Sequence, residues 1–201
     1  MSKIRYLANN IALFSVSNFV SKVLVFLLVP LYTNVLSTRE YGIADVFQVT
    51  LLLLVPALTV NMGEGALRFG IEYREKRGSI LSSGLRITFL AAGAVAFFCL
   101  LGMVFVPSEI RWYLFLFIFL FFTNAMYEFL ILYFQGSELV PVVVVGSIFS
   151  TLTMILCNLL FLLVFKIGLN GYLFSQMIAF GAAALLMLLL GLSKQRQADD
   201  F

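Results

Sequence analysis

Six apolar segments, each long enough to cross a lipid bilayer, follow one another along this chain of 201 residues. A helix needs about 20 apolar residues to cross a hydrocarbon core roughly 30 Å thick. The segments that meet this length are residues 11–35, 43–66, 80–106, 112–134, 140–165 and 172–192. We therefore expect an all-α integral membrane protein, with a six-helix transmembrane domain over residues 1–192 and a cytoplasmic tail over residues 193–201.

The scarcity of charge supports a membrane protein. Charged residues make up 11% of the chain, whereas a soluble domain carries roughly 25%. A signal peptide followed by a soluble domain is rejected, because the apolar runs recur up to the C-terminal end. A transmembrane β-barrel is rejected because its strands alternate polar and apolar residues, and residues 112–120 do not alternate.

Basic residues are unevenly distributed between the two sides that six crossings would create. One side carries nine of them: Lys3, Arg5, Arg68, Arg74, Lys76, Arg77, Arg86, Lys194 and Arg196. The other side carries Arg39, Arg111 and Lys166. Because Lys and Arg are enriched in cytoplasmic loops, both termini are predicted to lie in the cytoplasm.

A polar stripe runs along the first segment. Lys22 lies near its middle, with Ser15, Asn18 and Ser21 within about 160° of helical arc. Charge at this depth is costly and faces a bundle interior or a watered cavity. Lys22 therefore contacts either an anionic group of a substrate or a carboxylate on another helix.

The second segment carries Asp45, Pro56, Glu64 and Arg68. Pro56 lacks a backbone donor, so a bend is expected there. Glu64 and Arg68 are four residues apart, with the acid first, as in a helical ion pair. They either neutralise each other, or Arg68 binds phosphate while Glu64 orients it or titrates.

Later segments carry fewer ionisable groups. Glu128, near Asn124 and Tyr127, and Asp45 are candidates for coupling to protons or sodium, or Glu128 is the partner of Lys22. Ser147, Thr151 and Asn158 share one face, where such residues more often bridge helices than bind ligands. The chain has no His, and Cys99 and Cys157 sit inside apolar runs, so no metal site and no cofactor are expected.

Part of the chain resembles a known family. The matching residues are Asn18-Phe19-Val20-Ser21-Lys22, Val29-Pro30-Leu31-Tyr32-Thr33-Asn34-Val35-Leu36-Ser37, Glu40-Tyr41-Gly42 and Gly63-Glu64-Gly65-Ala66-Leu67-Arg68-Phe69. They resemble the N-terminal lobe of the polysaccharide (lipid-linked oligosaccharide) flippases of the multidrug/oligosaccharidyl-lipid/polysaccharide exporter superfamily. This specific likeness covers about a quarter of the chain.

The resemblance implies a function. Such a protein would flip an undecaprenyl-diphosphate-linked oligosaccharide across the bacterial inner membrane for cell-surface polysaccharide synthesis, without enzymatic activity. Lys22 and, less closely, Arg68 would be the cations of its cavity. Family members have twelve or more helices, so this chain matches a truncated first lobe. Its partners would be membrane lipid, the glycan substrate, and a second lobe or a second copy of the chain, with no nucleic acid.

Three alternatives remain beside the flippase lobe. A drug or cation antiporter of the same superfamily would need an acidic cavity, against which a central Lys22 argues. A membrane-embedded glycosyltransferase or polymerase would need larger hydrophilic loops or an acidic metal-binding motif. A non-transporting structural subunit would fit the half-length chain.

Overall fold

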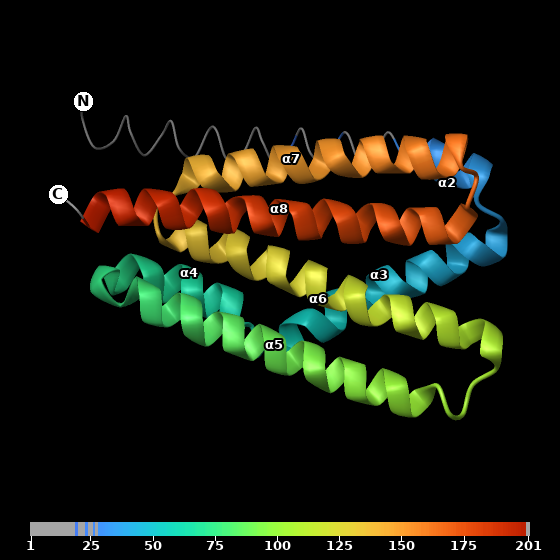
Figure 1. Cartoon of the computed structure of the whole chain (residues 1–201), viewed down its shortest axis with the longest axis horizontal. Coiled ribbons are helices and arrows are strands. Elements are labelled where there is room, and N and C mark those ends of the chain that lie inside the picture. Colours follow the sequence, from blue (N-terminus) through green and yellow to red (C-terminus); the bar gives the residue numbers. More distant parts are fainter. Residues whose placement is uncertain (1–18, 20–22, 24–25, 27, 200–201) are drawn as a thin grey trace.

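The computed structural model describes residues 19, 23, 26 and 28–199, which form a bundle of long helices (Figure 1). The elements from residue 29 onward are α2 (Val29–Val35), α3 (Thr38–Leu58), α4 (Met62–Glu72), the 3-10 helix η1 (Arg74–Lys76), α5 (Arg77–Gly102), α6 (Ser108–Gly136), α7 (Val140–Asn158), the π-helix η2 (Leu159–Val164) and α8 (Gly168–Asp199). No strand occurs among the described residues, so the expected all-α class is confirmed for them.

Five helical stretches of the described residues are long and apolar enough to cross a membrane. They are Thr38–Leu58, Arg74–Gly102, Ser108–Gly136, Val140–Val164 and Gly168–Ser193. Most of the first expected segment, residues 11–35, lies outside the described residues, and α2 is its last part. The total of six membrane helices therefore stays a prediction.

Helix α6 lies at the centre of the bundle, between α8 on one side and α4 and α5 on the other (Figure 1). Its side chains Leu120, Phe121, Tyr133 and Phe134 are fully buried. Helix α7 packs along α8. The outer surface is apolar as well: Leu52 is 73% exposed and Leu90 is 74% exposed. Apolar surface of this extent suits an apolar surrounding better than water.

The second expected segment consists of two helices in the structure. Helix α3 ends at Leu58 and α4 begins at Met62, while Val60 and Asn61 between them have left-handed φ values of 52° and 48°. Pro56 has no N–H to donate, and its carbonyl accepts the N–H of Asn61 (2.8 Å), five residues later instead of four. The chain thus breaks shortly after Pro56, where we expected a bend in a continuous helix.

Helix α4 crosses the end of α6 with the two backbones in contact. A Cβ on Gly136 would lie 2.6 Å from the carbonyl oxygen of Leu67 and 2.8 Å from that of Ala66. Just beyond, Glu138 pairs with Arg74 (2.7 Å) and Arg77 (3.7 Å). Although the break separates α4 from α3, the close approach at Gly136 fixes α4 to α6, and the ion pairs of Glu138 hold η1 and the start of α5 to the end of α6.

Candidate functional site

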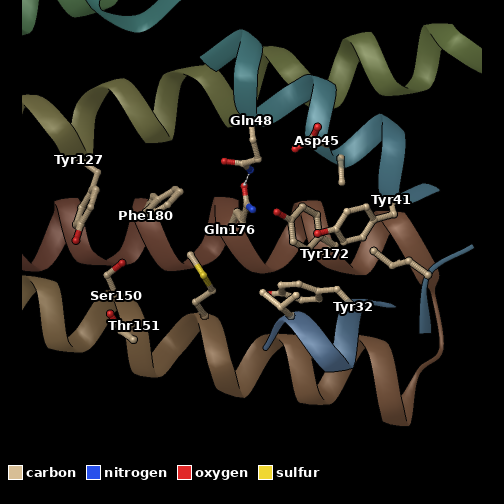
Figure 2. A pocket seen from close by; sticks show the side chains of 14 residues that line it. Tyr32, Tyr41, Asp45, Gln48, Tyr127, Ser150, Thr151, Tyr172, Gln176 and Phe180 are labelled. Atoms are coloured by element: carbon tan, nitrogen blue, oxygen red, sulfur yellow. Dashed lines mark hydrogen bonds between the residues drawn. The ribbon is translucent and has the colours of Figure 1, made fainter. Parts of the chain in front are cut away.

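A cavity of about 430 Å³ lies between α2, α3, α6, α7 and α8 (Figure 2). We call it the central cavity. Small-molecule sites span about 300–1,000 Å³, so it can hold a small ligand or one part of a larger one. Its wall combines rings with polar side chains, namely Tyr32, Tyr41, Tyr127, Tyr172 and Phe180 with Asp45, Gln48, Ser150, Thr151 and Gln176.

Two amides meet across the central cavity. The Gln48 Nε2 atom on α3 donates to the Gln176 Oε1 atom on α8 at 2.7 Å, and Figure 2 shows the pair bridging the two helices. Each amide has further donor or acceptor capacity beyond this bond. The pair can therefore bind hydroxyl groups of a ligand while it links α3 to α8.

Aromatic rings flank this amide pair at both ends. Tyr32 packs edge-on against Tyr172 with ring centroids 4.9 Å apart, and Tyr127 stacks on Phe180 at 5.0 Å. The Tyr127 hydroxyl points toward Ser150 in Figure 2. The rings offer flat apolar faces, while their hydroxyls add polar groups at the edges.

Polar side chains of α7 donate hydrogen bonds to backbone carbonyls of the same helix. Thr151 Oγ1 donates to the Ser147 carbonyl (2.9 Å), and Asn158 Nδ2 donates to the Met154 carbonyl (2.8 Å). Ser147, Thr151 and Asn158 are all buried. Of these three residues, Thr151 also lines the central cavity, so its oxygen is available to a ligand as an acceptor.

The expected cationic cavity stays a prediction, because Lys22 lies outside the described residues. The charged residue that the structure places on the wall of the central cavity is acidic. Asp45 lines it, and no Lys or Arg of the described residues does. The expected cavity residues Lys22, Asn18 and Ser15 lie outside the described residues. Arg68, the other expected cation, is placed elsewhere, on the exposed surface of α4.

Glu64 and Arg68 are both exposed on α4. The buried side of this helix is formed by Ala66 and Gly70, which face α6. The ion pairs of the described residues do not include one between Glu64 and Arg68. The structure does not bring this pair together or place it at the central cavity; both side chains are available to an outside partner.

Glu128 does not line the central cavity and lies beside the break between α3 and α4. It lines a shallow cavity of about 240 Å³ with Gln48 and Asn124. It also lines a much smaller one, of about 40 Å³, which we call the break cavity, with Thr59, Asn61 and Thr88. The two carboxylates singled out for ion coupling, Asp45 and Glu128, therefore belong to different cavities.

Sequence reasoning did not select Tyr32, Tyr172 or Gln176 as site residues. The sequence could have indicated two of them. Tyr172 and Gln176 are one helical turn apart, so they share a face of an otherwise apolar helix. Tyr32 had been noticed only as part of the flippase-like motif. Its place in the cavity depends on packing against Tyr172, 140 residues away along the chain.

We compared the chain with models of known families, with curated proteins and with solved structures, and none of them matched. The site must therefore be interpreted from its own chemistry.

Proposed function

We propose that the chain is a multi-pass transmembrane lobe of the bacterial inner membrane with a cytoplasmic C-terminus. Its long apolar helices and exposed apolar side chains support a lipid environment. The basic turn at η1 and the C-terminal end of α8 lie at the same end of the bundle in Figure 1, as the prevalence of basic residues in cytoplasmic loops requires. Lys3 and Arg5 support the same side for the N-terminus.

The lobe serves to translocate a lipid-linked oligosaccharide, with undecaprenyl diphosphate as the lipid carrier. The observation that carries this proposal is the combination of rings and amides in the central cavity. A sugar ring has hydroxyls at its edge and C–H groups on its faces. Amides and hydroxyls can bind the edge, while flat tyrosine rings can cover the faces.

Arg68 supplies a cation for the diphosphate in this proposal. Its guanidinium is exposed on α4, and no carboxylate of the described residues pairs with it. Arg binds phosphate in a bidentate manner, and the attraction strengthens where water is excluded. Lys22 would be the second cation, as the resemblance implies.

Translocation by alternating access needs a second body against which the lobe can rock. This second body is either a second lobe continuing the same protein or a second copy of this chain.

A binding experiment tests the glycan assignment. The purified chain in lipid nanodiscs is titrated with undecaprenyl diphosphate, with and without a short neutral oligosaccharide. We expect the attached glycan to lower the dissociation constant. In Gln176→Leu this decrease should be about tenfold smaller, which is the value of one polar contact. Ile178→Ala, on an exposed part of α8, is the matched control and should keep the full decrease. Equal affinity for both lipids would refute the glycan assignment.

A second candidate function is the antiport of an organic cation. The observation that favours it is Asp45 among four tyrosines in the central cavity. A carboxylate and aromatic faces both attract a cation. Saturable binding of tetraphenylphosphonium that Asp45→Asn abolishes would establish this candidate over the glycan.

A further inference from the structure

We propose that the break cavity is a binding site for a single sodium ion, distinct from the central cavity and independent of what that cavity carries. The cavity lies where α3 ends and α4 begins, against α5 and α6. Interrupted helices are a recurrent place for cation sites in transporters, because the break brings polar groups into an apolar bundle.

In the part of the chain that the structure describes, four residues with side-chain oxygen atoms line the break cavity: Thr59 and Thr88 are buried, while Asn61 and Glu128 are exposed. Glu128 offers a carboxylate, Thr59 and Thr88 offer hydroxyls, and Asn61 offers an amide oxygen. Such uncharged and anionic oxygens are the ligands that hard cations prefer. A site of this composition favours a hard cation over an anion or an apolar ligand.

The hydroxyl protons are already committed, which leaves both hydroxyl oxygens as acceptors. Thr59 Oγ1 donates to the Val55 carbonyl (2.7 Å), and Thr88 Oγ1 donates to the Gly84 carbonyl (2.9 Å). Both threonines are buried. Their remaining lone pairs are therefore free to accept a hydrogen bond or to bind a cation.

Glu128 has no cationic partner among the described residues. Glu128 is exposed on α6, a helix apolar enough to cross a membrane, and a carboxylate that faces lipid there is costly unless its charge is compensated. Among the described residues Glu128 is the only carboxylate on the wall of the break cavity, so one monovalent cation balances its charge.

The volume of the break cavity restricts the ligand further. A cavity needs about 10–15 Å³ of accessible volume to hold one water molecule, so about 40 Å³ accommodates a nearly dehydrated ion and excludes a sugar or an organic cation. Mg²⁺ retains several waters of its hydration shell, and the cavity has no room for them. Sodium fits both the charge and the volume.

The backbone at the break has a strained conformation, and a ligand site there would explain why this strain is kept. Val60 is β-branched and still adopts a left-handed φ of 52°, a conformation that such residues rarely take. The turn it forms places Thr59 and Asn61 on the wall of the same cavity. Strained backbone of this kind concentrates at ligand sites.

The test is equilibrium binding of ²²Na⁺ to the purified whole chain in nanodiscs, at constant ionic strength set with choline chloride. We expect saturable binding of one ion per chain. Glu128→Gln should weaken it by roughly tenfold or more, and Asn61→Gly, which keeps the left-handed backbone and removes the amide, by roughly severalfold. The control Glu109→Gln removes an exposed carboxylate in the first turn of α6, outside the break cavity, and should bind as the original does.

Two results would overturn the proposal. One is the absence of saturable ²²Na⁺ binding to the original chain. The other is unchanged binding in both Glu128→Gln and Asn61→Gly, each first checked for a monodisperse elution profile. No glycan lipid is present in this assay, so its failure would leave the proposed function untouched, and loss of glycan binding would leave the sodium site untouched.

Discussion

The carboxylate of Glu40 accepts a hydrogen bond from the backbone N–H of Leu169 at 3.2 Å, across 129 residues of chain. Its other oxygen accepts the N–H and the hydroxyl of Ser37, at 2.9 and 2.7 Å. Glu40 therefore closes a capping box at the start of α3 and also ties that turn to the start of α8. Gly168 permits the contact, because its φ is 54° and a Cβ would lie 2.6 Å from the Glu40 Oε1 atom.

Glu40→Ala should lower the free energy of unfolding by about 2 kcal/mol, because it removes a helix cap and a charge-assisted hydrogen bond together. Thermal unfolding in detergent measures the effect. Glu109→Ala is the control, since its ion pair with Arg39 is exposed and 3.9 Å long and should contribute almost nothing. Equal melting temperatures for the two variants would show that Glu40 does not hold these turns together.

Gly136→Ala should destabilise the bundle by about 1–3 kcal/mol, because the added methyl group collides with backbone that cannot rotate away. The neighbours in question are the carbonyl oxygens of Ala66 and Leu67. Gly93→Ala tests the same exchange in a helix with open space around it, and it should be neutral or stabilising. Thermal unfolding of both variants measures the difference. An unchanged melting temperature in Gly136→Ala would contradict the close crossing of α4 and α6.

Val60→Asn should stabilise the chain by about 1 kcal/mol, because Asn tolerates left-handed φ and a β-branched residue does not. The reverse exchange at the next position, Asn61→Val, should destabilise it. A melting temperature that falls in Val60→Asn would contradict the left-handed turn. Because Val60 is exposed and does not line the break cavity, sodium binding should survive this change.

Gln48 and Gln176 should be coupled in a double-mutant cycle of Gln48→Leu and Gln176→Leu. Each single exchange leaves one amide without its partner, whereas the double exchange removes both. We expect an interaction free energy of about 1 kcal/mol in thermal unfolding. Strictly additive effects would mean that the 2.7 Å bond contributes nothing to the link between α3 and α8.

The apolar runs were sufficient to place most of the long helices, because a membrane-length segment is encoded locally in about 20 consecutive residues. The expected segment 140–165, for example, corresponds to Val140–Val164 in the structure. The break at Val60 was not predictable in the same way. Pro56 signals a disturbance, but the position of the break also depends on the packing of α4 against α6.

The candidate site was only partly accessible from the sequence. Asp45 and Glu128 were identified because a carboxylate in an apolar run is locally conspicuous. The link from Glu40 to Leu169 and the ring pair of Tyr32 and Tyr172 join residues more than 120 positions apart. Such pairs are decided by tertiary packing, so no local pattern in one sequence can indicate them.

The central claim is that the substrate is a lipid-linked glycan, and competition between the two substrate classes tests it most directly. The whole chain in nanodiscs is given undecaprenyl-diphosphate-linked oligosaccharide and tetraphenylphosphonium, separately and together, and binding of each is measured at equilibrium. We predict saturable binding of the glycan lipid that tetraphenylphosphonium does not displace. Saturable binding of tetraphenylphosphonium with none of the glycan lipid would contradict the account.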